Sequence, residues 1–99
     1  METLTNIQFN PEGYLTDLEQ WNPEVARVLA QEEGIELTED HWKVLDYLQD
    51  QYKKEIPLTI RRVGKSGVVT IKEFYQLFPK GPLKISSRLA GIPKPASCI

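Results

Sequence analysis

Proline and glycine divide this chain into short segments, and their positions limit the helices that it can form. Asn22-Pro23-Glu24 supplies an N-cap, a proline at the first helical position and an acid near the positive end of the helix dipole. Gly34 provides a stop for this helix. Thr38-Glu39-Asp40 begins a second helix in the same way, and Pro57 ends it. Further boundaries are expected at Gly64, Gly67, Pro79, Gly81, Pro82 and Gly91.

Side-chain patterns between these boundaries complete the helical prediction. The second helix has the clearest period of 3.6, with a predicted stripe of Trp42, Leu45, Leu48 and Tyr52. A short basic helix is expected over residues 58–62. A capping box formed by Thr70 and Glu73 predicts a helix that ends at Pro79, and Gly81-Pro82 begins the last one. His41 is expected to be a solvated residue, and the two tryptophans, Trp21 and Trp42, to contribute to the core.

The N-terminal segment has a different pattern. Ile7-Gln8-Phe9 alternates in polarity, the turn residues 10–13 follow, and Tyr14-Leu15-Thr16 can return antiparallel. We therefore expect an α+β, mainly helical fold, in which a small N-terminal β-hairpin or meander packs on an array of short helices. A chain of 99 residues supports one small core, so residues 1–91 form a single predicted domain. Two alternating prolines in residues 92–99 favour an extended, flexible C-terminal arm.

Several classes of protein are excluded by composition. No stretch approaches the roughly 18 apolar residues of a membrane span. One cysteine cannot form an internal disulfide, so a reducing compartment, the cytoplasm, is expected. A single histidine and a distant cysteine predict no metal site. Gly64-Lys65-Ser66 is not a phosphate-binding loop, because position 59 is threonine where that motif needs glycine. We expect no cofactor.

The net charge of −2 conceals two opposed halves. Residues 1–50 carry twelve acids and two bases, for a charge of −10, whereas residues 51–99 carry ten bases and two acids, for +8. A basic surface for a partner would explain this asymmetry, and so would mutual attraction of the two halves. Composition alone leaves both explanations open.

The one cysteine, Cys98, lies in the predicted arm, one residue before the last. Eight extended residues at about 3.1 Å each would give its thiol a reach of about 25 Å. An exposed thiol is prone to oxidation and disulfide exchange, which suggests a use for it. An incidental surface cysteine is the alternative, because exposure alone does not make a thiol reactive.

A longer pattern surrounds this cysteine. The segments 77–82 (LFPKGP) and 90–95 (AGIPKP), with Lys84 between them and Cys98-Ile99 after them, resemble the C-terminal motif of the DsrC/TusE sulfur-relay family. Upstream, segments 12–15, 32–35 and 41–42, together with Trp21, also resemble family positions, so the resemblance covers nearly the whole chain. The chain departs from the family at residues 56–72, where it is shorter than typical members.

A second departure concerns mechanism. Members that work with dissimilatory sulfite reductase carry another cysteine eleven positions before the terminal one, and this chain has Ser87 there. It therefore resembles the one-cysteine, TusE-like branch, which implies that Cys98 accepts sulfane sulfur as a persulfide and passes it to an acceptor protein. The implied partners are the donor and acceptor proteins of a relay for tRNA 2-thiouridine synthesis. The resemblance also implies that the chain acts as a sulfur carrier rather than as an autonomous enzyme.

Thiolate is the attacking species, and at an ordinary cysteine pKa near 8.5 only about 3% is ionised at pH 7. Three bases, Lys84, Arg88 and Lys94, could stabilise it if the arm folds back, or could steer an acidic partner. Two alternative functions stay open: an accessory, gamma-type subunit or regulator of a sulfite reductase-like complex, and a tRNA-binding helical domain suggested by the basic half. The basic segment itself has no interleaved aromatic residues.

Overall fold

The computed structural model describes residues 7–94, and a bundle of five α-helices makes up most of this range. A short 3-10 helix, η2 (Leu18–Gln20), precedes α1 (Pro23–Glu32) and α2 (Glu39–Lys53). After a connecting loop come α3 (Ile60–Lys65), α4 (Ile71–Leu77) and α5 (Pro82–Ala90). Within the described residues, no helix is long and apolar enough to cross a membrane.

Local capping explains most helix starts. The Asn22 side chain accepts a hydrogen bond from the Val25 N–H at 3.0 Å, and Pro23 follows it, as predicted. Thr70 and Glu73 form the predicted capping box, with bonds of 3.1 and 2.8 Å. Because these bonds join residues three positions apart, the sequence pattern was sufficient to place them.

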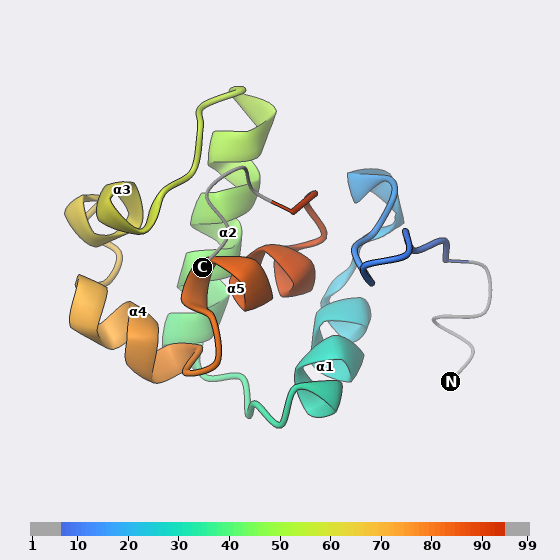
Figure 1. Ribbon diagram of the computed structural model, residues 1–99, viewed down its shortest axis with the longest axis horizontal. Helices are drawn as coiled ribbons and strands as arrows, with labels where there is room; N and C mark the ends of the chain where they lie inside the picture. Colours follow the sequence, from blue (N-terminus) through green and yellow to red (C-terminus); the bar gives the residue numbers. More distant parts are fainter. Residues whose placement is uncertain (1–6, 95–99) are drawn as a thin grey trace.

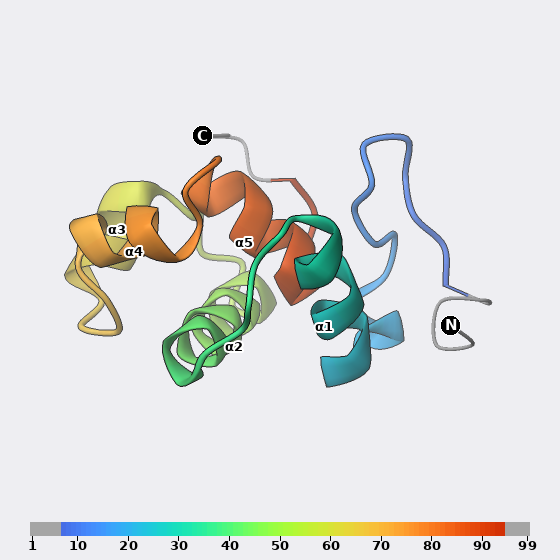
Figure 2. The ribbon, with the colours of Figure 1, turned by 90° about the horizontal axis from the view of Figure 1, so that it is seen from below.

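Helix α5 is central to the bundle. It packs against α1, α2 and α4, while α3 packs mainly against α4 (Figures 1 and 2). Seven of its nine residues are buried, including two serines. The core around α5 gathers apolar side chains from all five α-helices, among them Val25, Leu45, Leu48, Val63, Phe74, Phe78, Leu83 and Leu89. The fold is therefore one packed unit whose last helix is its core element.

The predicted β-hairpin and the α+β class are wrong. Residues 7–94 contain no β-strand, only an isolated antiparallel bridge between Phe9 and Leu15. The Asn10 side chain accepts hydrogen bonds from the Glu12 and Tyr14 N–H groups at 2.9 and 3.0 Å, so local loop bonds replace a ladder. Asp17 then caps η2 directly after the bridge, which ends the extended segment. The mainly helical part of the prediction is confirmed.

The predicted stripe of α2 is also shifted. Its buried residues are His41, Val44, Leu45 and Leu48. Tyr52 is 42% exposed, and Trp42 lies half-buried at the edge of the face, where the Arg27 guanidinium stacks 5.4 Å from its ring centroid. The face of α2 that packs into the core is therefore rotated from the predicted stripe toward His41.

Candidate functional site

The base of the predicted arm is held by the end of α5. Gly91 has a φ of 78°, and the Ile92 N–H donates to the Ser87 carbonyl at 3.2 Å, which turns the chain off the helix. Ile92 itself is buried, with 1% exposure. Trp21 covers this turn, because its Nε1 donates to the Leu89 carbonyl at 2.7 Å. The chain thus leaves α5 at a fixed point and in a fixed direction.

A second contact anchors the chain two residues later. The Lys94 Nζ lies 2.7 Å from a Glu12 carboxylate oxygen in the N-terminal loop. Cys98 and the other residues after Lys94 lie outside the described residues. Cys98 follows Lys94 by four positions, and four residues span at most about 14 Å. Anchoring at Ile92 and Lys94 therefore shortens the reach of about 25 Å expected for an arm that is free from residue 92.

Arg88 is held by three acceptors. Its Nη1 and Nη2 lie 2.9 and 3.0 Å from carboxylate oxygens of Glu33 and Glu32, and its Nε donates to the Gly13 carbonyl at 2.9 Å. The Arg88 side chain is only 18% exposed. This cation therefore joins α5 to the end of α1 and to the N-terminal loop, and two carboxylates already balance its charge.

Lys84 has a different environment. Its side chain is exposed and forms no ion pair within residues 7–94, while its carbonyl accepts from the Tyr14 hydroxyl at 3.0 Å. A depression of about 390 Å³ brings Lys84 and Arg88 together. It is lined by Glu12, Tyr14, Glu33, Lys80, Lys84, Ile85 and Arg88. Lys94 reaches the same area through Glu12, so the three bases singled out in the sequence do share one surface.

Sequence reasoning missed Lys80 at this depression. Lys80 precedes Lys84 by four positions. Because Pro79 and Pro82 interrupt the helical pattern between them, the sequence did not indicate that the two lysines line one surface. A mixed set of bases and carboxylates forms the lining, which suits docking of a polar partner more than capture of a small anion.

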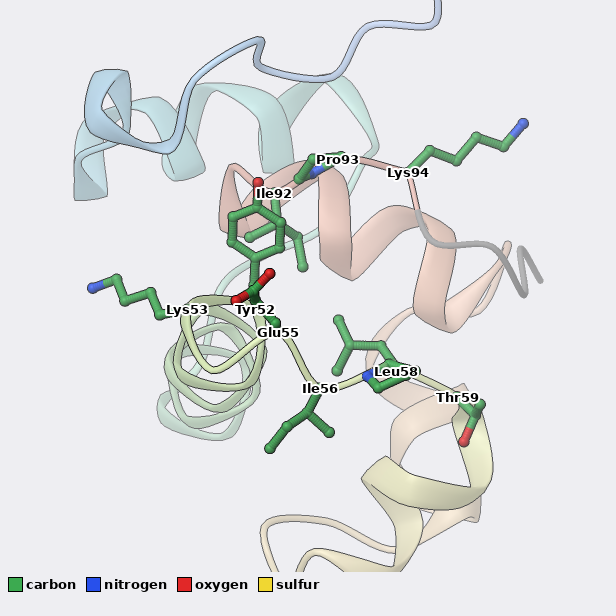
Figure 3. Close-up of a pocket in the computed structure, with 10 residues that line it drawn as sticks. Tyr52, Lys53, Glu55, Ile56, Leu58, Thr59, Ile92, Pro93 and Lys94 are labelled. Carbon is green, nitrogen blue, oxygen red and sulfur yellow. The ribbon is translucent and has the colours of Figure 1, made fainter.

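An apolar groove of about 610 Å³ lies on the other side of the arm's base (Figure 3). The Tyr52 ring points toward Ile92 and Pro93, whereas Lys53 and Lys94 point away from the groove. Pro57 and Leu58 in the loop after α2 close the remaining wall. The arm therefore begins between a polar depression and an apolar groove.

Two buried polar residues complete the site's support. His41 is 5% exposed, so the expectation of a solvated histidine is wrong. Its Nδ1 accepts from the Thr38 N–H at 3.0 Å and its Nε2 donates to the Leu77 carbonyl at 2.9 Å, which joins the start of α2 to the end of α4. Ser87 is fully buried, and its Oγ has no hydrogen-bond partner among the described residues.

Within residues 7–94, no cluster of His, Cys, Asp and Glu could hold a metal ion.

Comparisons with known proteins agree with this fold. The model of the family described as "DsrC like protein" matches residues 3–99. "Sulfurtransferase TusE" of Buchnera aphidicola is 40% identical over 106 residues, covering 98% of this chain and 92% of the relative. "Sulfite reductase, dissimilatory-type subunit gamma" of Nitratidesulfovibrio vulgaris is 38% identical over 96 residues, covering 95% and 91%.

A solved structure extends the likeness to three dimensions. A chain in the crystal structure of dissimilatory sulfite reductase I superposes with a TM-score of 0.82 at 37% identity, covering 94% of this chain and 91% of that one. The protein belongs to the DsrC-like family, and the family predicted from the C-terminal motif is confirmed.

Proposed function

We propose that this protein is a sulfur carrier, which accepts sulfane sulfur on Cys98 and delivers it to an acceptor protein in a sulfur relay. The observation that carries the proposal is the position of the chain's one cysteine, four residues beyond the anchored Lys94 and within the range matched by the family model. A thiol on a short tether can enter the active site of a donor and then that of an acceptor, while the helical body supplies the docking surface.

The proposed chemistry is a pair of thiol exchanges. The Cys98 thiolate attacks the terminal sulfur of a donor persulfide, the donor's S–S bond breaks, and the donor cysteine leaves as a thiolate. An acceptor thiolate then attacks the outer sulfur of the Cys98 persulfide, and Cys98 leaves as a thiolate. Neither step needs an external oxidant, because one S–S bond replaces another. We place this chemistry in a reducing compartment such as the cytoplasm, where a single thiol stays reduced between rounds.

Three bases have different proposed roles in this scheme. Arg88 and Lys94 already face carboxylates, so we assign to them the positioning of the arm's base. Lys84 keeps an exposed ammonium, so we assign to it the stabilisation of the Cys98 thiolate or of an acidic partner surface.

The relay that we propose supplies tRNA 2-thiouridine synthesis, as the resemblance to the one-cysteine, TusE-like branch implies, and the relatives named "Sulfurtransferase TusE" support a sulfur-transfer role. The alternative is a gamma-type subunit or regulator of a sulfite reductase-like complex, which the gamma-subunit relative and the sulfite reductase structure support. Ser87 favours the relay, since the one-cysteine branch of the family cannot form an internal disulfide.

Deletion of the gene in the organism that encodes this chain tests the proposal. The relay predicts that 2-thiouridine in bulk tRNA, measured by mass spectrometry of nucleosides, falls severalfold and returns with the wild-type gene but not with Cys98→Ala. Unchanged 2-thiouridine, with a loss of sulfite reductase activity in the extract, would instead establish the alternative. Recovery of 2-thiouridine by Cys98→Ala would contradict carriage on this thiol.

A further inference from the structure

Some basic residues in the second half of the chain pair with carboxylates on folding, and others do not. Arg88 and Lys94 pair with carboxylates from the acidic first half, so mutual attraction accounts for them. Arg61, Arg62 and Lys65 on α3 are exposed, and they form no ion pair with any residue in the range 7–94. The charge asymmetry of the sequence therefore persists on α3 as an uncompensated basic surface.

These three cations surround a depression of about 400 Å³. Its lining is Tyr47 from α2 and Thr59, Arg61, Arg62, Lys65 and Ser66 from α3 and its ends. No carboxylate and no aliphatic side chain belongs to it. We call this set the α3 basic cluster.

Local hydrogen bonds fix the two ends of the cluster. The Thr59 hydroxyl accepts from the Arg62 N–H at 3.0 Å, which caps the start of α3. At the other end, the Ser66 hydroxyl donates to the Val63 carbonyl at 2.6 Å and accepts from the Val68 N–H at 3.1 Å. The cations are thus presented by a helical turn that is held at both ends.

The position of α3 separates the cluster from the acids of α1 and of the turn after it. Helices α3 and α4 lie at the opposite end of the molecule from α1 and the N-terminal segment (Figures 1 and 2). Helix α1 and the turn after it carry Glu24, Glu32 and Glu33. An anionic partner approaching α3 would therefore meet the basic end of the molecule first.

The chemistry of the lining indicates which kind of anionic partner fits. The core of a protein docking surface is more apolar than its rim, whereas no aliphatic side chain lines the α3 basic cluster. Two guanidinium groups can each contact phosphate oxygens bidentately, and the half-buried Tyr47 ring belongs to the same lining. Sequence reasoning could not associate this ring with the basic segment, because it comes from another helix.

We propose that the α3 basic cluster binds the phosphate backbone of RNA. The inference deepens the proposed function, on which it rests for the choice of tRNA as the RNA. An RNA contact at α3 would hold the carrier beside the nucleic acid that is being modified, independently of the thiol on the arm.

The test uses the full chain with Cys98→Ser, so that no mixed disulfide or bound sulfur contributes. Binding of a fluorescently labelled tRNA transcript is followed by anisotropy between about 50 and 200 mM salt, the range over which phosphate contacts weaken most visibly. The cluster variant is Arg61→Gln, Arg62→Gln and Lys65→Gln. The matched control is Lys43→Gln, Lys53→Gln and Lys54→Gln, which removes the same charge from exposed positions outside the cluster. Thermal unfolding verifies that both variants are folded.

We expect the cluster variant to bind at least tenfold more weakly at the lowest salt and to lose about 2 from the log–log salt slope. The control should change the dissociation constant less than threefold. Equal losses in the two variants, or no binding by the parent at low salt, would overturn the proposal. Equal competition by polyglutamate at matched charge would point to an acidic protein instead and would also overturn it.

Sulfur loading separates this proposal from the previous one. With Cys98 retained, the cluster variant should accept sulfur from glutathione persulfide at the wild-type rate, because the cluster does not include the thiol. Failure of loading in the wild type would refute the carrier function while leaving the RNA result intact, and a tenfold loss of RNA binding with normal loading would support both.

Discussion

The guanidinium of Arg88 lies 2.9 Å from the carboxylate of Glu33, across the junction between α5 and the end of α1. Both side chains are mostly shielded from solvent, at 18% and 25% exposure. The same guanidinium reaches Glu32 and the Gly13 carbonyl. One side chain therefore fixes the N-terminal loop, α1 and the helix from which the arm emerges.

Arg88→Met should lower the free energy of unfolding by about 2 kcal/mol, because it leaves two carboxylates and a carbonyl without their donor. Arg88→Lys should recover less than half of this loss, since a single ammonium cannot bind three acceptors in a fork. Urea titration followed by circular dichroism measures both changes. Lys54→Met, which breaks an exposed pair with Asp50, is the control and should change stability by less than about 0.5 kcal/mol. A full recovery by lysine would show that charge alone matters at this position.

Gly91→Ala should destabilise the protein by about 2 kcal/mol or more, through a positive φ and a steric conflict. A Cβ at this position would lie 2.7 Å from the Cδ1 atom of Trp21. Gly34→Ala is the matched control, because its φ of 72° is similar and no atom lies within 4 Å of the added Cβ. Gly34→Ala should lower the free energy of unfolding by only about 1 kcal/mol. Equal losses in the two variants, measured by thermal unfolding, would mean that Trp21 moves away without penalty.

Ser87→Ala should leave stability unchanged or raise it by about 1 kcal/mol, because the hydroxyl is buried without a partner among the described residues. Ser86→Ala is the comparison, since the neighbouring Ser86 hydroxyl donates to the Leu83 carbonyl at 3.2 Å. Ser86→Ala should raise the free energy of unfolding by less than Ser87→Ala does, or lower it slightly. A loss above about 2 kcal/mol in Ser87→Ala would show that this hydroxyl is hydrogen-bonded in solution.

On the proposed role of Lys84, Lys84→Gln should slow alkylation of Cys98 by iodoacetamide at pH 7 about twofold, since loss of a cation that stabilises the thiolate lowers the thiolate fraction. The effect should shrink as salt is added. Lys43→Gln, an exposed substitution on α2, should have no effect. An unchanged rate in Lys84→Gln would assign this lysine to partner docking alone.

The features that the sequence predicted correctly depend on local contacts. Asn22 and Thr70 cap their helices through bonds to residues three positions away, so a short pattern contains the whole interaction. The family was recognised from a motif in the C-terminal segment, and the match over residues 3–99 confirms it.

The features that the sequence did not predict depend on contacts between residues far apart in the chain. The Nε2 of His41 bonds to a carbonyl 36 residues away, and Tyr47 of α2 joins the α3 basic cluster only in the folded chain. The hairpin prediction failed because Asn10 and Asp17 offered the backbone local bonds that competed with a ladder. Anchoring of the arm by Lys94 required Glu12, 82 positions earlier.

Carriage of sulfur by Cys98 is most directly tested by the intact mass of the protein after incubation with glutathione persulfide. The account predicts one added sulfur, about +32 Da, that maps to Cys98, is removed by a reducing thiol, and is absent from Cys98→Ala. An unmodified wild-type protein, or the same adduct on Cys98→Ala, would contradict it.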